Sequence, residues 1–453
     1  MQTLLAQRDT LVIMPTGGGK SICFQLPALL QTGLTLVVSP LVALMENQVQ
    51  ELLGRGIPAA LLHSQLSISQ RKQTLRQLEQ QQLKLLYLSP ETLLSLPVWE
   101  RLCQPDLQIS MLALDEAHCL AQWGETFRPA YYRLGAVRPA LLKHKPPGTN
   151  ITIAAFTATA DPPVQKTIQR VLRLQEPAVF SLNPYRPNLH LQVQQVWTPR
   201  GRRQQLLRFI RAQQQTTGLV YMRSRRDSED LAAWLEQQGY STSAYHAGLS
   251  SIERRQIEQS WLQGNTEFVI CTNAFGLGIN KPNVRWVVHF HAPFLLSEYV
   301  QEIGRAGRDG KPAVTLTLIS ETTGLLEPED KRRRQFFQEQ IRRQQQSAQT
   351  LVRKLPAQGE IATVSKQFKD GEIALSLLHS TGRLEWSDPF HYQLQTGKSE
   401  PVGQSNTRAV QQMVDYLKTR KCRWQMLLHE FGFKESQELQ CGHCDNCDRL
   451  KGK

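Results

Sequence analysis

Short apolar runs alternate with longer amphipathic stretches from Thr10 to about Ile319. One set of apolar runs is TLVIM, TLVVS, LKLLYL, SMLAL and ITIAAF, and a second set is GLVYM, FVICT, RWVVHF and VTLTLI. Buried strands that alternate with helices favour parallel sheets covered on both faces. Pro184 and Pro187 interrupt the pattern between the two sets. The sequence therefore predicts an α/β protein with two parallel-sheet lobes, over residues 1–183 and 184–320.

The pattern changes after Ser320. The stretch KRRRQFFQEQIRRQQQ is basic, rich in Gln and predicted to be helical. Within residues 321–406 a helix, a glycine turn and two short strands are then expected, which is the order of a small winged-helix-like insert. The polar stretch LQTGKSEPVGQSN is typical of a flexible linker. A last region, residues 407–453, is expected to be helical and to end in closely spaced cysteines.

Hydropathy and net charge indicate where the protein acts and what it binds. No apolar run reaches the ~18–20 residues that a membrane span needs, and no secretory signal opens the chain. We therefore expect a cytoplasmic protein. Lys and Arg number 53 against 39 Asp and Glu, a net charge of +14. Such an excess favours polyanions such as nucleic acid, although a solubilising surface would have the same composition.

A glycine-rich turn follows the first predicted strand, in LVIMPTGGGKS. Glycines let backbone amides converge on phosphate oxygens, and the helix that follows adds its N-terminal dipole. We expect Lys20 to reach the β- and γ-phosphates of ATP and Ser21 to hold Mg²⁺. Met14 stands where the general pattern has Gly or Ala, so the loop is a variant. The predicted nucleotide-binding residues are Thr16, Gly17, Gly18, Gly19, Lys20, Ser21 and Asp115.

Two adjacent carboxylates end another predicted strand, in SMLALDEAH. In open α/β sheets ligand chemistry gathers at this end of the strands. Asp115 is suited to hold the water shell of Mg²⁺, and Glu116 to orient or deprotonate an attacking water. A solvated acidic turn would contain the same residues, but the phosphate loop upstream favours the catalytic interpretation.

Seven stretches follow the motif order of superfamily 2 helicases: MPTGGGKS, SPLVALMENQV, YLSPETL, LDEAHC, AFTATA, VICTNAFGLGINKPNVRWVVHFHAP and YVQEIGRAGRDG. AFGLGINKPNVR, GRAGRDG and the Trp-containing stretch after DEAH resemble the RecQ DNA helicases specifically. The resemblance covers residues 8–320 and resumes at 407–447. It implies two RecA-like lobes with ATP in the cleft between them, and 3′ to 5′ movement on single-stranded DNA with unwinding ahead. It also implies a role in DNA repair or recombination.

The resemblance also implies roles for individual residues. Gln301, Arg305 and Arg308 would reach the phosphates, with Arg308 as the arginine finger. Trp123 and Phe127 would stack on DNA bases beside the cationic Arg128, unless the two rings are core residues. Glu125 and Thr126 stand where the family usually has His and Asp, which leaves the strength of coupling between DNA and ATP open. The catalytic set is Lys20, Asp115, Glu116, His118, Gln301, Arg305 and Arg308, and the DNA-binding set is Trp123, Phe127, Arg128, Thr157, Thr159, Arg223 and His246.

The cysteines near the end of the chain have the spacing of a metal site. In CGHCDNC, Cys441, Cys444 and Cys447 are separated by two residues each, and Cys422 lies on the preceding helix. Four thiolates satisfy tetrahedral Zn²⁺, and the arrangement resembles the RecQ zinc module. His443 is a competing ligand; free thiols or disulfides are the alternatives, but disulfides are unexpected in a reducing compartment. We expect a structural zinc.

Two features of the family are not found in the sequence. The adenine-reading Gln and its aromatic anchor have no counterpart before Met14, and no winged helix follows Cys447. Residues 355–395 could supply a displaced wing, with Trp386, Phe390 or His391 at a strand-separating tip. These gaps leave two alternatives to a helicase: a DNA-stimulated ATPase, translocase or annealing factor, and an ATPase-impaired DNA-binding protein. The expected partners are single-stranded and forked duplex DNA, with single-strand-binding protein and other repair proteins, for a nucleoid-associated monomer.

Overall fold

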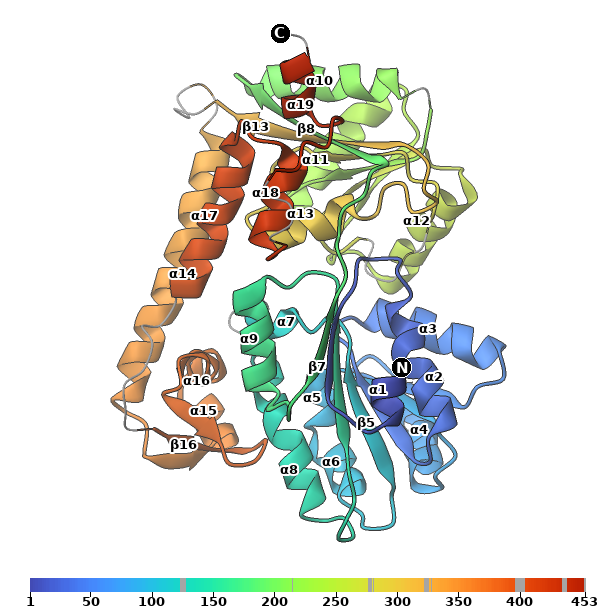
Figure 1. Cartoon of the computed structure of the whole chain (residues 1–453), viewed down its shortest axis with the longest axis vertical. Coiled ribbons are helices and arrows are strands. Elements are labelled where there is room, and N and C mark those ends of the chain that lie inside the picture. Colours follow the sequence, from blue (N-terminus) through green and yellow to red (C-terminus); the bar gives the residue numbers. More distant parts are fainter. Residues whose placement is uncertain are drawn as a thin grey trace. The chain divides into compact units, whose positions relative to one another are not determined.

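The structure is a computed structural model that describes residues 1–122, 128–213, 215–275, 279, 281–321, 326, 328–395, 404–433 and 438–451. The chain divides into two compact units (Figure 1). The first comprises Met1–Met14, Gly18–Leu182 and Glu339–Asn406, and the second comprises Pro15–Gly17, Asn183–Gln338 and Thr407–Lys453. Each unit therefore contains one lobe together with a later part of the chain.

The first lobe is a parallel sheet of seven strands in the order β3-β4-β2-β5-β6-β1-β7. The central strands are buried along their whole length because helices cover both faces. One face packs on α1–α3, and the other on α4 to α9, which include the 3₁₀ helix η1. In Figure 1, α2 and α3 lie on the opposite side of this sheet from α8 and α9. The elements are β1 (Thr10–Ile13), β2 (Leu34–Val38), β3 (Ala59–Leu62), β4 (Leu85–Leu88), β5 (Ile109–Leu114), β6 (Thr152–Thr157), β7 (Ala178–Ser181), α1 (Gln2–Leu5), α2 (Lys20–Leu30), α3 (Val42–Gly54), α4 (Ile68–Glu79), α5 (Pro90–Leu93), α6 (Leu96–Leu102), α7 (Cys119–Gln122), η1 (Pro129–Ala136), α8 (Val137–Leu142) and α9 (Pro162–Val171).

The second lobe repeats this architecture with six parallel strands in the order β10-β11-β9-β12-β13-β8. Three of its helices, α10, α11 and α12, begin at side-chain caps that the sequence provides: Thr198, Ser224 and Ser250 each accept a hydrogen bond from a backbone amide of the first turn. The elements are β8 (Leu189–Val196), β9 (Gly218–Tyr221), β10 (Thr242–Tyr245), β11 (Phe268–Cys271), β12 (Trp286–His289), β13 (Ala313–Ser320), α10 (Pro199–Ala212), α11 (Arg225–Gln237), α12 (Ser251–Gln263) and α13 (Leu296–Ile303).

The zinc module, which we define as α17 (Gln404–Lys418), α18 (Arg423–Glu430), α19 (Asp445–Lys451) and the four nearby cysteines, packs on the second lobe. Met413, Tyr416 and Trp424 join the same hydrophobic core as Tyr299 of α13. The Tyr416 hydroxyl donates to the Tyr299 hydroxyl at 3.0 Å, and the Trp424 indole donates to the Leu189 carbonyl at 3.2 Å. This core ties the zinc module to one edge of the second lobe.

The winged-helix-like module lies between α14 (Glu329–Val352) and the zinc module in sequence. It consists of β14 (Gln358–Glu360), α15 (Ile361–Gln367), α16 (Gly371–Ser380), β15 (Leu384–Trp386) and β16 (His391–Leu394). The three strands form an antiparallel sheet in the order β14-β16-β15. Its core includes Leu375, Trp386 and Tyr392, and also Ala136 of η1. The module therefore belongs structurally to the first unit.

The predicted fold class is confirmed: two RecA-like parallel-sheet lobes are followed by a helical region with four clustered cysteines and a small winged-helix-like insert. None of the helices in the described ranges is long and apolar enough to cross a membrane.

Candidate active site

The carboxylate pair lies where β5 ends in the first lobe. The Asp115 amide still donates to the Val38 carbonyl at 2.9 Å, which continues the pairing of β5 with β2. The chain then turns sharply, because Glu116 has a φ of +50°, a left-handed conformation that is uncommon outside glycine. The Glu116 amide donates to Asp115 Oδ1 at 2.9 Å. This turn places both carboxylates directly after β5, where both are buried.

The phosphate loop connects β1 to α2 of the first lobe, although Pro15–Gly17 within the loop group with the second unit. Gly17 and Gly19 have φ values of +83° and +85°, which glycine adopts without strain. Helix α2 begins at Lys20, so its unpaired first-turn amides lie directly after the loop. Lys20 Nζ lies 3.3 Å from Glu116 Oε1. The structure thus brings the predicted phosphate-binding lysine to the predicted catalytic carboxylate.

The two carboxyl groups have opposite electrostatic environments. Burial and the neighbouring Glu116 raise the pKa of Asp115 to about 6. Burial would also raise the pKa of Glu116, but Lys20 and His118 together hold the pKa of that carboxyl below its ordinary value. A buried carboxylate beside a second one is a suitable oxygen ligand for a divalent cation, because the cation relieves their repulsion. The donor set therefore fits Mg²⁺ together with a nucleotide phosphate.

His118 connects the carboxylate turn to the end of β6. Its Nδ1 lies 3.0 Å from Thr157 Oγ1 and 3.3 Å from Glu116 Oε2. The Thr159 amide donates to Thr157 Oγ1 at 3.2 Å. All four side chains are buried. The TAT segment is therefore in contact with the carboxylate turn through one histidine.

The structure describes only part of the segment that is predicted to stack on DNA bases. Trp123, Phe127 and the two substituted positions, Glu125 and Thr126, lie outside the described residues. Arg128 is described, and its Nη1 donates to Glu91 Oε2 at 3.3 Å.

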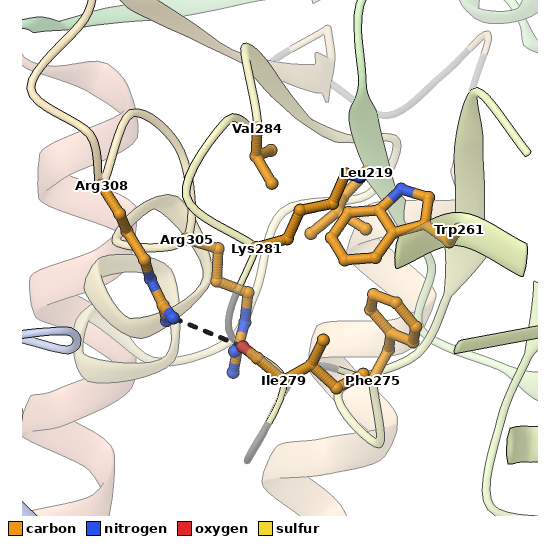
Figure 2. A pocket seen from close by; sticks show the side chains of 8 residues that line it. All are labelled: Leu219, Trp261, Phe275, Ile279, Lys281, Val284, Arg305 and Arg308. Carbon is orange, nitrogen blue, oxygen red and sulfur yellow. Dashed lines mark hydrogen bonds between the residues drawn. The ribbon is translucent and has the colours of Figure 1, made fainter. Parts of the chain in front are cut away.

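In the second lobe, Gln301, Arg305 and Arg308 gather at the end of α13. Figure 2 shows Arg305 and Arg308 at a small cavity with Trp261 and Lys281, and a hydrogen bond from Arg308 Nη1 to the Ile279 carbonyl at 3.3 Å. The cavity, about 10 Å³, has room for about one water molecule. Burial and Arg305 lower the pKa of Arg308 to about 10, so this guanidinium remains charged at neutral pH.

Gln301 has a polar group that is unpaired within the described part of the chain. Its amide nitrogen is buried and has no hydrogen-bond partner among the described residues. A buried amide without a partner costs free energy, which a bound acceptor such as a phosphate oxygen would recover.

The predicted DNA contacts of the second lobe already have partners inside it. Arg223 Nη2 donates to both oxygens of Glu302, at 3.1 and 2.8 Å. His246 Nε2 lies 2.8 Å from Glu229 Oε1, and His246 Nδ1 accepts from the Gly248 amide at 3.2 Å. A DNA phosphate would therefore have to compete with a carboxylate at both residues.

The four predicted zinc ligands form one cluster. The sulfur atoms of Cys422, Cys441, Cys444 and Cys447 all lie within 4.8 Å of one another. Backbone amides of Cys441 and Arg423 donate to the sulfurs of Cys422 and Cys444, at 3.4 and 3.5 Å, as around zinc thiolates. His443, the competing ligand, points its Nε2 at the Tyr185 hydroxyl instead, at 3.1 Å. The donor set fits tetrahedral Zn²⁺.

Gln48 is a site residue that sequence reasoning missed. Its Nε2, on α3, donates to Asp115 Oδ2 at 3.4 Å. Gln48 does lie within the helicase-like stretch SPLVALMENQV, so the signal was present, but a single Gln on an amphipathic helix usually faces solvent.

The hypothesis of a strand-separating tip at Trp386 or Phe390 is wrong. Trp386 is 1% exposed, within the core of the winged-helix-like module, and Phe390 packs against Trp99 of the first lobe with ring centroids 5.4 Å apart. Apolar rings at these positions gain more from burial than from exposure, which the alternating pattern of a short strand did not reveal. His391 is exposed and lies beside Asp388.

A glycine-rich phosphate loop, a buried Asp-Glu turn and a second RecA-like lobe with clustered arginines define an ATP-dependent helicase. Family models agree: a DEAD/DEAH box helicase matches residues 1–167, a helicase conserved C-terminal domain matches 201–310, and a RecQ zinc-binding region matches 389–448.

Curated relatives identify the family. An ATP-dependent DNA helicase RecQ of Synechocystis is 53% identical over 447 residues, which cover 98% of this chain and 93% of the relative. A protein of the same name from Pasteurella multocida is 43% identical over 309 residues, 68% of this chain and 47% of that one. The chain belongs to the RecQ family of ATP-dependent DNA helicases.

Solved structures support the fold alone. The Mycobacterium smegmatis helicase Lhr bound to single-stranded DNA and AMP-PNP has a TM-score of 0.56 at 19% identity, over 91% of this chain and 59% of that one. The DEAD-box helicase Mss116 has a TM-score of 0.59 at 16% identity, over 71% of this chain and 68% of that one.

Proposed function

We propose that this chain couples ATP hydrolysis to 3′ to 5′ movement along single-stranded DNA and thereby unwinds forked duplexes during DNA repair or recombination. The observation that carries the proposal is the contact between the phosphate loop and the carboxylate turn, Lys20 to Glu116 at 3.3 Å, in a chain of this family. A phosphate-binding lysine and a catalytic carboxylate at this distance can act on the same phosphoryl group.

We assign the hydrolytic roles as follows. Lys20 leaves Glu116 and binds the β- and γ-phosphates of ATP, while the loop from Thr16 to Gly19 offers backbone amides. Glu116, released from Lys20, accepts a proton from the attacking water as the water's oxygen bonds to the γ-phosphorus and the bond to ADP breaks. Mg²⁺, held by Ser21 and Asp115, would neutralise charge on the phosphate oxygens.

The second lobe supplies positive charge in this proposal. Arg308 acts as the arginine finger, and Gln301 and Arg305 complete the phosphate contacts. Arg308 is half-buried and keeps its charge at neutral pH, which supports the assignment, since a partly desolvated cation interacts strongly with a phosphoryl group.

Residues of each lobe are proposed to contact DNA. Trp123 and Phe127 would stack on bases, while Arg128, Thr157, Thr159, Arg223 and His246 would contact the strand. Contact between His118, Glu116 and Thr157 supports a route by which the strand influences hydrolysis. Single-strand-binding protein and other repair proteins are proposed partners of a monomer.

The test is strand displacement on two fluorescent duplexes of the same sequence, one with a 3′ tail and one with a 5′ tail. We expect ATP-dependent unwinding of the 3′-tailed duplex, and none by a Lys20→Ala variant. Equal unwinding of the 5′-tailed duplex would contradict the proposed polarity.

A second candidate is a DNA-stimulated translocase that hydrolyses ATP with little unwinding. It is favoured by the burial of Trp386 and the contact of Phe390 with Trp99, which remove two rings from any strand-separating role. DNA-stimulated ATP turnover without displacement of either tailed duplex would identify it.

A further inference from the structure

The 3₁₀ helix η1 lies between the carboxylate turn and the winged-helix-like module. It begins at Pro129, directly after the segment that carries Trp123, Phe127 and Arg128. Every residue from Ala130 to Ala136 is buried, which is unusual for so short a helix and means that η1 is covered on more than one side.

One side of η1 faces the carboxylate turn. Tyr131 is fully buried in the same hydrophobic core as Cys119 and Leu120, which follow His118 in the chain. The Cys119 amide in turn donates to the Glu116 carbonyl at 3.0 Å. A displacement of η1 would therefore shift the turn that positions Glu116, because closely packed cores transmit strain.

Another side of η1 faces the winged-helix-like module. Ser376 of α16 donates to the Pro129 carbonyl at 3.3 Å. Arg133 Nη1 donates to the Pro389 carbonyl, in the turn between β15 and β16, at 3.3 Å. The rings of Tyr132 and His379 meet edge to face at 5.8 Å. The contacts extend along the whole of η1, since Ala136 belongs to the module's own core.

Further contacts fix the edges of the same interface. Arg173, after α9, donates to the Trp386 carbonyl at 2.7 Å and to Glu385 Oε1 at 3.1 Å. Phe390 packs against Trp99 of α6, with ring planes at 76°. The module is thus held on the first lobe by its second helix, by β15 and by the turn before β16.

These contacts occupy the surfaces with which a winged helix ordinarily binds DNA. The second helix of a helix-turn-helix enters the major groove. Here that helix, α16, reads GEIALSLLHS, has no Lys or Arg, and buries most of its residues. A DNA-reading helix would instead be polar and exposed.

We propose that the winged-helix-like module is a positioning domain. By docking on η1, it fixes Arg128, at the end of the segment predicted to bind DNA, and the carboxylate turn. It holds both in the geometry that DNA-stimulated hydrolysis requires. Its positioning residues are Arg133 and Ser376 at the centre of the interface and Arg173 and Phe390 at its edges. The inference rests on the proposed function, since it assumes that the segment before η1 contacts DNA.

The test measures ATP hydrolysis by the full-length, zinc-containing chain, without DNA and over a range of single-stranded DNA concentrations. Arg173→Glu places two carboxylates together at the interface, and Phe390→Ala removes an aromatic contact. We expect each to lower the DNA-stimulated rate about fivefold, as loss of a surface ion pair or an aromatic edge contact allows, with the basal rate changed less than about twofold. Adding Glu385→Arg to Arg173→Glu reverses the ion pair and should restore part of the stimulation, because the hydrogen bond to the Trp386 carbonyl stays lost.

Lys366→Glu is the matched control, because it reverses a charge on an exposed residue of α15. We expect it to behave as wild type. Unchanged stimulation in both Arg173→Glu and Phe390→Ala would overturn the inference, as would a selective loss of DNA affinity in Lys366→Glu, which would make the module a DNA-binding surface. If the wild-type chain itself shows no stimulation by DNA, the proposed function fails instead.

Discussion

The zinc module and the winged-helix-like module differ in what holds each of them to its lobe. The zinc module has four clustered cysteines and a partly buried ion pair between Arg423 and Asp445, and it shares a core with the second lobe. The winged-helix-like module has no such cluster among its described residues. It docks on the first lobe through backbone carbonyls, aromatic edges and one helix face.

Because the two modules are held differently, they should respond to different perturbations. A metal cluster loses much of its affinity in one step when a ligand is lost, because a closed four-coordinate zinc site then opens to water. A docking surface made of many weak contacts loses strength gradually, and its loss affects the element that it holds more than the stability of the chain.

The largest effect is expected at the zinc cluster. Cys444→Ser should remove stoichiometric zinc and destabilise the module by more than about 5 kcal/mol, because structural zinc supplies folding free energy. Zinc content and thermal unfolding check this. Cys103→Ser, outside the cluster, is the matched control and should retain zinc. Retention of one zinc per chain by Cys444→Ser would contradict the assignment.

A smaller effect is expected in the core of the winged-helix-like module. Trp386→Ala should cost about 3–5 kcal/mol within this module, because it leaves a large cavity. Proteolysis between residues 353 and 403 should become faster while zinc content stays unchanged. Trp197→Ala, which truncates an exposed tryptophan, is the control. Loss of zinc from Trp386→Ala would show that the two modules do not behave independently.

The smallest effect is a pH dependence at the docking surface. Burial, with Arg170 and Arg173 nearby, lowers the pKa of His379 to about 4 from its ordinary 6.5. Below pH 6.5 the unfolded chain binds the proton and the folded chain does not, so the stability that neutral His379 provides is complete above pH 6.5 and decreases toward pH 4. Between pH 7 and 5 we expect a loss of about 2 kcal/mol.

The check on this prediction is the difference between two unfolding series. His379→Gln should flatten the dependence between pH 7 and 5, whereas His391→Gln, at an exposed histidine, should not. Identical slopes in wild type and His379→Gln would refute the role of His379.

The same contrast explains how much could be predicted from the sequence. The sheets, the phosphate loop, the Asp115–Glu116 pair and the four cysteines carry local signals: alternating apolar runs, glycines before Lys-Ser, and cysteines two residues apart. No local signal reveals that Arg133 binds the Pro389 carbonyl, because any residue has a carbonyl and the two are far apart in sequence. The same holds for Arg223 and the Glu302 carboxylate, which are also far apart in sequence. Nor did the apolar sequence of α16 reveal whether its buried face meets its own module or the first lobe.

We propose that Lys20, Asp115 and Glu116 form the hydrolytic centre of a DNA-dependent ATPase. ATP turnover at saturating Mg²⁺–ATP, measured with and without single-stranded DNA, tests this most directly. We expect DNA to raise the rate about tenfold or more and Glu116→Gln to lower it by about 10²-fold or more, while nucleotide binding persists. Glu100→Gln, at an exposed position of α6, should not change it. Stimulated turnover that survives Glu116→Gln would contradict the account.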